Sequence, residues 1–162
     1  MTLLQPILRS DAPAAVVLVR LIVGGVFFSE GTQKFLYPAE NGPGRFARIG
    51  IPAPDVMAPF VGVIEIVCGA LILFGLLTRL AAMPLIINML VAILSTKIPI
   101  LLGQGFWGFS LRTVPYYGFW GMAHEARTDF AMLLGSIFLL IVGAGAWSID
   151  ARFSSRSTRS DV

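Results

Sequence analysis

The sequence of 162 residues has few charged residues, a single cysteine and a single histidine. One cysteine, Cys68, cannot form a disulfide within the chain, so a relay of paired thiols is excluded within one molecule. One histidine, His124, cannot supply both axial ligands of a bis-histidine haem. We therefore expect neither chemistry from a single chain, and we interpret Cys68 as a small buried residue rather than a nucleophile.

The low charge content also argues against an ordinary soluble domain. Charged residues make up 13% of the chain and hydrophobic residues 56%, whereas a typical soluble domain has about 25% charged residues. The mean hydropathy is +0.82. The glycines of "GPGRFARIG" follow no predicted strand, so they form no dinucleotide-binding fingerprint. The composition is typical of a membrane protein in contact with the lipid bilayer.

Four apolar segments are long enough to cross a hydrocarbon core of about 30 Å, which takes roughly 20 helical residues. We predict an all-α integral membrane four-helix bundle in a single domain. Its helices are expected at residues 14–36, 56–77, 80–102 and 130–147, followed by a polar basic tail at 148–162. The short "GLLTR" stretch requires a tight antiparallel hairpin between the second and third helices. We interpret the tail as a solvated end and expect no nucleic-acid binding.

The two longer connections differ in composition. Residues 39–55 are rich in glycine and proline, which indicates a loop with one amphipathic turn around Phe46 and Ile49. Residues 103–129 contain two Trp, two Tyr and three Phe, which favours a connection at the membrane interface, with a lid over a ligand site as the alternative. We expect Thr128 or Asp129 to cap the fourth helix.

His124, Glu125 and Asp129 lie close together in the sequence and are of the residue types that bind metal ions. An ordinary polar entrance to the fourth helix explains the same residues. We therefore predict no metal site, and the sequence identifies no catalytic residue.

Polar residues gather on one face of the first predicted helix. A spacing of three or four residues places the following on that face: Arg20, Gly24, Phe27, Gly31 and Lys34. Glu30 lies at the shoulder of the face, one turn before Lys34. We predict an (i, i+4) pair between Glu30 and Lys34 at the membrane interface, from which Lys34 could reach an anionic or carbonyl-bearing ligand.

Glu65 lies near the middle of the second predicted helix, on a face with Gly62 and Gly69. An ionised side chain at such a depth costs on the order of 2.5 to 3.5 kcal/mol, so Glu65 should be protonated or paired. We predict Arg20 as its partner across the two helices, with Asn88 adding hydrogen-bond donors. The predicted ligand-binding or buried polar centre is therefore Arg20, Glu30, Lys34, Glu65 and Asn88. Arg20, Glu65 and Asn88 could equally do no more than hold the bundle together.

Three stretches of the sequence resemble the DoxX family of small four-helix membrane proteins. They are "LVRLIVGGVFFSEGTQKFLYP", "FARIGIPAP" and "GVIEIVCGALILFGLLTRLAAMPLIINML", which together cover most of residues 17–90. The residues that match the family pattern are Arg20, Gly31, Lys34, Glu65, Gly69 and Arg79. The last third of the chain shares only an aromatic loop and a fourth helix with the family.

The resemblance implies membrane redox chemistry, because members of this family are linked to a thiosulfate to quinone oxidoreductase and to enzymes of oxidative stress. The expected function is a redox-associated subunit that binds a quinone-like lipophilic ligand, with a soluble redox or sulfur-metabolism enzyme as its partner. A small transporter or an assembly scaffold with a structural charge network is the alternative. The sequence fixes no cofactor, reaction or oligomeric state.

Orientation is predicted from the positive charges. With four crossings, both termini and the hairpin at Arg79 share one side of the membrane. The basic tail and the short hairpin favour the cytoplasmic side, because basic residues near short loops stay inside. We expect a bacterial cytoplasmic membrane protein with both termini in the cytoplasm.

Overall fold

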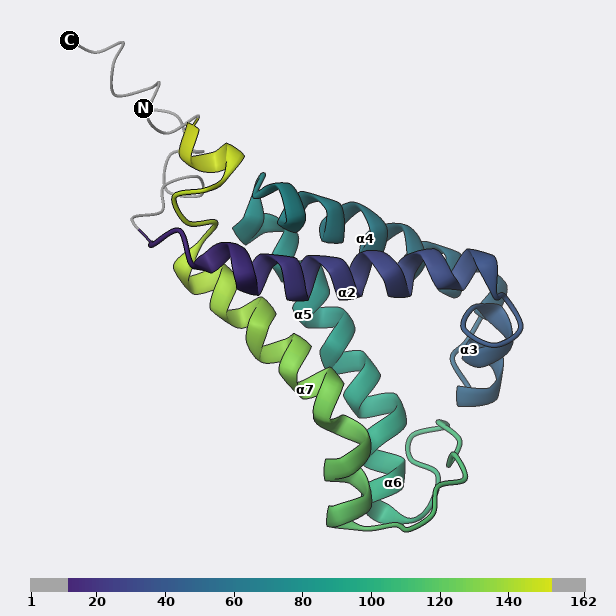
Figure 1. The fold of residues 1–162 in the computed structure, drawn as a ribbon. Helices are drawn as coiled ribbons and strands as arrows, with labels where there is room; N and C mark the ends of the chain where they lie inside the picture. The colour runs from purple at the N-terminus through teal and green to yellow at the C-terminus, as the bar shows by residue number, and fades with distance from the viewer. Residues whose placement is uncertain (1–11, 153–162) are drawn as a thin grey trace, which may run out of the picture.

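The computed structural model describes residues 12–152, and its regular elements are helices. They are α2 (Val16–Leu36), α3 (Pro43–Ile49), α4 (Pro54–Phe74), α5 (Thr78–Ala92), η1 (Ile93–Lys97), α6 (Ile98–Leu102) and α7 (Phe119–Val142). Within residues 12–152, β structure is limited to an isolated bridge between Phe106 and Phe109. The predicted all-α class is confirmed (Figure 1).

Three of the described helices are long and apolar enough to cross a membrane. They are α2, α4 and the continuous 25-residue helix Thr78–Leu102, which is built from α5, η1 and α6. A fourth long helix, α7, has 24 residues, but Glu125, Arg127 and Asp129 make its first half polar. The described residues thus form a bundle of four long helices, three of which can cross a membrane, while the fourth is apolar mainly in its second half.

The predicted bounds of the fourth helix, 130–147, are wrong at both ends. The helix begins at Phe119, after Gly118 with φ +90°, and ends at Val142, before Gly143 with φ +86°. Thr128 and Asp129 therefore lie inside α7 and do not cap it. The polar residues before residue 130 belong to the helix and not to the predicted connection. A helix tolerates charged side chains that form ion pairs, and here Glu125 pairs with Arg112 and Asp129 with Lys97.

The α4–α5 hairpin begins earlier than predicted and has a three-residue connection, residues 75–77. Helix α4 ends at Phe74 because Gly75 adopts the left-handed conformation, φ +66°, and donates its N–H to the carbonyl oxygen of Ile72. Helix α5 then begins at Thr78, after Leu77, which also has a positive φ. The second and third helices therefore run over 54–74 and 78–102 rather than 56–77 and 80–102.

Helices α2 and α4 pack through glycines. A Cβ atom added to Gly31 would lie 2.7 Å from the carbonyl oxygen of Gly62, and one added to Gly24 would lie 2.8 Å from that of Gly69. Small residues allow such close approach of helices in a membrane. The predicted inward faces of the first two helices are confirmed by this contact. The contact also fixes the antiparallel register of the pair.

The bundle consists of two helix pairs that separate toward one end. Helix α2 packs mainly on α4, and α5 packs mainly on α7. Figure 1 shows the two pairs diverging, with α3 and the segment after α6 at the open end. Helix α3 is the predicted amphipathic turn, and its Phe46 is buried. The α4–α5 hairpin lies at the closed end.

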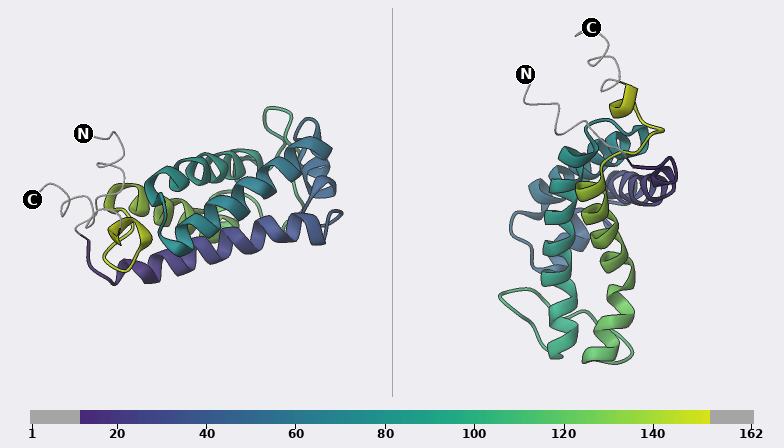
Figure 2. Two further views of the ribbon diagram at one scale, coloured as in Figure 1. Left: turned by 90° about the horizontal axis from the view of Figure 1, so that it is seen from above. Right: turned by 90° about the vertical axis from the view of Figure 1, so that its left-hand side faces the viewer.

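The start of α2 and the segment after α7 lie together at the closed end of the bundle (Figure 2). Ala146 donates its backbone N–H to the carbonyl oxygen of Ala12 at 3.1 Å. Ser148 and Asp150 are buried there, so the predicted solvated tail starts too early at residue 148. The remainder of that predicted tail, 153–162, lies outside the described residues.

Buried and exposed apolar side chains divide the helices into two sides. The buried core contains Val23, Phe27, Ile72, Leu85 and Leu139. Many large apolar side chains face outward instead, among them Leu18, Ile22, Val63, Ile87 and Ile141. Such a broad apolar exterior is what a bilayer requires of a helical membrane protein.

Candidate functional site

A cavity of about 410 Å³ lies between the two helix pairs and is bounded by α3. We call it the inner cavity. Apolar residues such as Val26, Phe27, Phe46, Met57 and Met89 line much of it. Its polar and charged lining residues are Glu30, Lys34, Asn41, Arg45, Glu65, Asn88, Ser95, Thr96, Lys97, Thr128 and Asp129. Half of the 22 lining residues are apolar, and apolar surface beside polar groups can bind and orient a small molecule.

Three of the predicted site residues meet on the wall of this cavity. Lys34 Nζ lies 2.5 Å from Glu65 Oε2, and Asn88 Nδ2 donates to Glu65 Oε1 at 2.7 Å. The side chains of Lys34 and Glu65 are 9% and 4% exposed. Each carboxylate oxygen of Glu65 thus accepts a hydrogen bond, one from α2 and one from α5, and the charge of Glu65 is matched by an ammonium group.

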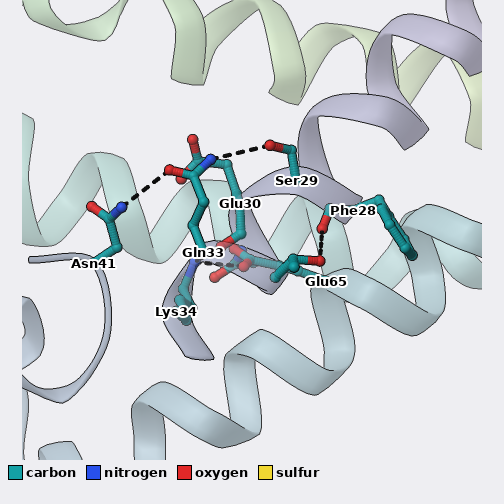
Figure 3. Close-up of polar contacts among 9 residues, drawn as sticks. Phe28, Ser29, Glu30, Gln33, Lys34, Asn41 and Glu65 are labelled. Carbon is teal, nitrogen blue, oxygen red and sulfur yellow. Dashed lines mark hydrogen bonds and ion pairs between the residues drawn. The ribbon is translucent and has the colours of Figure 1, made fainter. Parts of the chain in front are cut away.

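The predicted side-chain pair between Glu30 and Lys34 is wrong. Lys34 Nζ contacts the backbone carbonyl oxygen of Glu30 at 3.4 Å, and its ion pair is with Glu65. Figure 3 shows Lys34 and Glu65 pointing toward one another. Glu65 is the more deeply buried carboxylate, so it gains more from a cation. Glu30 is half-buried on the cavity wall, and its carboxylate accepts no hydrogen bond from residues 12–152.

A short chain of polar side chains runs beside this pair at the end of α2. Asn41 Nδ2 donates to Gln33 Oε1, and Gln33 Nε2 donates to Ser29 Oγ, both at 3.1 Å. Figure 3 shows this chain passing alongside Glu30. It ties the loop after α2 to the helix and so helps to hold the cavity wall next to Lys34 and Glu30.

The predicted pair between Arg20 and Glu65 is also wrong. Arg20 is 2% exposed, and its guanidinium donates to four backbone carbonyl oxygens. Two of them belong to the last turn of α4, Ile72 at 2.9 Å and Leu73 at 2.6 Å. The other two belong to Ala144 at 3.1 Å and Trp147 at 2.6 Å, in the segment after α7.

The antiparallel register of α2 and α4 explains the error. Because Gly24 meets Gly69 and Gly31 meets Gly62, Arg20 lies beside residues 72–73 rather than beside Glu65. Seven to eight residues at 1.5 Å each separate these levels by about 11 Å along the helix axis. Arg20 therefore donates to carbonyl oxygens in the last turn of α4, of which that of Ile72 also accepts the N–H of Gly75. It is a structural clamp at the closed end and does not line the inner cavity.

Asp150 completes this clamp. Its two carboxylate oxygens accept the backbone N–H groups of Leu77, at 2.8 Å, and Thr78, at 3.1 Å. An acidic group is favourable there because the first N–H groups of a helix have no partner within the helix. The clamp formed by Arg20 and Asp150 thus fastens α2, the α4–α5 hairpin and the segment after α7.

A second ion pair lines the inner cavity, and sequence reasoning did not assign it to the site. Lys97 Nζ lies 3.1 Å from Asp129 Oδ2, and the lysine side chain is 7% exposed. Lys97 ends the π-helical turn η1, a distortion that is frequent at functional sites and that here contains buried Ser95 as well. The polar run "STK" at the end of an apolar helix was the sequence signal for this pair.

The residues weighed as a metal site do not converge. Asp129 pairs with Lys97, Glu125 pairs with Arg112 at 2.5 Å, and His124 contacts Arg127 at 2.9 Å. Among the described residues, no three His, Cys, Asp or Glu side chains are grouped closely enough to hold a metal ion. Cys68 is buried in the core, as predicted, and does not line the inner cavity.

The wall leaves hydrogen-bonding capacity for a ligand. The ammonium group of Lys34 has three donors, and the structure uses two of them, for Glu65 and for the carbonyl of Glu30. Its position on the cavity wall allows the third donor to address a carbonyl or anionic oxygen. The carboxylate of Glu30 provides an acceptor on the same wall.

Comparisons with known proteins agree with the fold. The DoxX family model matches residues 15–98, just over half of the chain. An uncharacterized membrane protein of Mycobacterium tuberculosis is 56% identical over 152 residues, covering 94% of this chain and 89% of the relative. A Bacillus subtilis protein named "Putative oxidoreductase CatD" is 29% identical over 133 residues, covering 82% of each chain.

A third relative, an uncharacterized protein of Haemophilus influenzae, is 30% identical over 148 residues and is covered over 96% of its length. No solved structure matches this chain significantly. The family model and the mycobacterial relative extend over all the residues of α2 and α4 that form the site. The chain therefore belongs to the DoxX family of membrane proteins.

Proposed function

We propose that this protein is a redox-associated membrane subunit that binds a quinone-like lipophilic ligand in the inner cavity. The observation that carries the proposal is the hydrogen-bonded group of Lys34, buried Glu65 and half-buried Asn88 on the wall of a cavity that also has apolar sides. A quinone needs apolar walls for its ring and tail and a few donors for its carbonyl oxygens. The name of the Bacillus subtilis relative adds support for a redox role.

Each polar residue has a distinct part in this proposal. Lys34 donates its remaining N–H to a quinone carbonyl oxygen, while Glu65 and the Glu30 carbonyl fix the position of the ammonium group. Asn88 holds the Glu65 carboxylate in place. Reduction of a quinone takes two electrons and two protons. Lys34 can supply one proton, water at the cavity supplies the second and reprotonates the lysine, and a soluble redox or sulfur-metabolism enzyme at the membrane surface supplies both electrons.

The membrane arrangement in the proposal has four crossings, with both chain termini in the cytoplasm of a bacterial cell. The hydrogen bond between Ala146 and Ala12 supports an even number of crossings, because it holds the beginning of α2 beside the segment that follows α7. The open end of the bundle and the inner cavity then face the opposite side of the membrane from the hairpin.

Ligand binding tests the proposal directly. The purified protein should contain quinone in its lipid extract, and a short-chain quinone should quench its tryptophan fluorescence. Lys34→Gln should weaken quinone binding at least tenfold, since a charged donor is lost. Arg127→Gln, which removes one positive charge away from the cavity, should bind normally. Equal quinone affinity in the parent protein and Lys34→Gln would contradict the proposal.

An assembly scaffold remains the second candidate, because the clamp of Arg20 and Asp150 shows that some buried charges in this bundle are architectural. On that reading the pair of Lys34 and Glu65 is also architectural. Lys34→Gln would then lower the stability of the protein without changing the affinity for any quinone.

A further inference from the structure

A second cavity adjoins the inner cavity at the open end of the bundle. It has a volume of about 580 Å³ and lies between the loop after α2, α3, the end of the third helix and residues 110–113. We call it the outer cavity. The two cavities share five lining residues: Asn41, Arg45, Ile49, Thr96 and Lys97. A ligand in the outer cavity would therefore lie next to the inner one.

The outer cavity is strongly basic. Its charged lining residues are Arg45, Arg48, Lys97 and Arg112 on the positive side and Glu40 on the negative side. The inner cavity, in contrast, has three of each sign, since Lys34, Lys97 and Arg45 face Glu30, Glu65 and Asp129. The positive potential is thus concentrated in the outer cavity, where it favours an anion.

Three of the four cations of the outer cavity have partners in the protein. Lys97 pairs with Asp129, and Arg112 pairs with Glu125. Arg48 donates to the backbone carbonyl oxygens of Ala39 and Glu40 and so orders the loop that forms one wall. These contacts hold the cavity in shape, and they consume donors that an anion would otherwise use.

Arg45 is different. It is half-buried and lines both cavities, and its side chain makes no hydrogen bond or ion pair with any residue in the range 12–152. Its guanidinium offers five N–H donors in a planar fork that matches two oxygens of a phosphate or sulfate group. Arg45 therefore has the position and the donors to bind an oxyanion, beside the ion-paired Lys97 and Arg112.

The surroundings place the outer cavity at the level of lipid headgroups. The neighbouring segment 103–118 and the start of α7 expose Trp107, Tyr116, Tyr117, Phe119 and Trp120, and exposed aromatic residues of this kind concentrate at the membrane interface. Figure 1 shows this segment and α3 together at the open end of the bundle. Phosphate groups of membrane lipids are abundant at that level.

We propose that the outer cavity is a binding site for a phosphate-type oxyanion, held by Arg45 and carried by a lipid headgroup or by a free anion. This proposal does not depend on the quinone in the inner cavity. The site would give the protein a requirement for an anionic compound at the mouth of its ligand cavity.

Thermal unfolding of delipidated protein in an uncharged detergent tests the site. The probes are phosphatidylglycerol, inorganic phosphate, and sodium chloride at equal ionic strength. We expect phosphatidylglycerol to stabilise the parent protein more than sodium chloride does. Stabilisation by phosphatidylglycerol alone identifies a headgroup as the source, whereas stabilisation by inorganic phosphate as well identifies a free oxyanion. Both outcomes support the site.

Substitutions of Arg45 test whether its side chain binds the stabilising anion. Arg45→Gln should weaken the apparent affinity for the stabilising probe about tenfold, and Arg45→Lys should restore part of it, because lysine keeps the charge but loses the fork of donors. Arg127→Gln is the charge-matched control, since Arg127 is exposed and lines neither cavity. A parent response no larger than that to sodium chloride, an unchanged response in Arg45→Gln, or an equal loss in Arg127→Gln would overturn the proposal.

Discussion

The ammonium group of Lys34 on α2 lies 2.5 Å from a carboxylate oxygen of Glu65 on α4. Their side chains are only 9% and 4% exposed at the wall of the inner cavity. An ion pair in such a place is costly to break, because each charge is left without its partner. The pair is therefore the first target for mutagenesis.

A double-mutant cycle should show that Lys34 and Glu65 are coupled. Lys34→Met and Glu65→Gln should each lower the free energy of unfolding by about 3 kcal/mol, because each leaves one buried partner unmatched. The double variant should lose clearly less than the sum. Unfolding in mixed detergent micelles measures all four proteins, and strictly additive losses would show that the two residues do not interact.

Arg20 should be essential for stability without contributing to ligand affinity. Arg20→Met removes the donors of four backbone carbonyl oxygens at the closed end, so we expect a loss of about 3 kcal/mol or more. Arg20→Lys should recover little, since an ammonium group cannot reproduce the guanidinium fork. A stable Arg20→Met protein with impaired quinone binding would contradict the structural role.

The glycine contact between α2 and α4 gives a matched pair of variants. Gly31→Ala places a Cβ atom 2.7 Å from the carbonyl oxygen of Gly62, so the helices must move apart and the melting temperature should fall. Gly25→Ala, on the same helix, meets nothing within 4 Å. It should leave the melting temperature unchanged or raise it slightly, because alanine favours a helix over glycine. Equal effects of both substitutions would argue against close packing at Gly31.

Cysteine labelling should establish the crossings, including that of α7. In a Cys68→Ala background, single cysteines at Asn41 and Trp120 should label from one side of the membrane, and those at Arg79 and Trp147 from the other. Trp120 and Trp147 are 76% and 71% exposed and lie outside the packed core. If positions 120 and 147 label from the same side, α7 does not cross the membrane.

The sequence by itself determined the membrane class, the helical fold and the inward faces of the first two helices. Bilayer length and hydropathy are local properties, and the spacing of Gly24, Gly31, Gly62 and Gly69 marks faces that only close helix packing requires. Glu65 was recognisable as a residue in need of a partner because a lone carboxylate inside a membrane is costly.

Only the tertiary structure decided which partner each charge has. The glycine register sets Arg20 against the end of α4 and leaves Lys34 to reach Glu65, and a sequence alone does not specify the register between two helices. Lys97 and Asp129 come together because the third helix and α7 pack side by side, with α7 starting earlier than hydropathy indicated. A charged side chain inside a membrane needs a partner, and the packing of the helices determines which polar or oppositely charged group lies within reach.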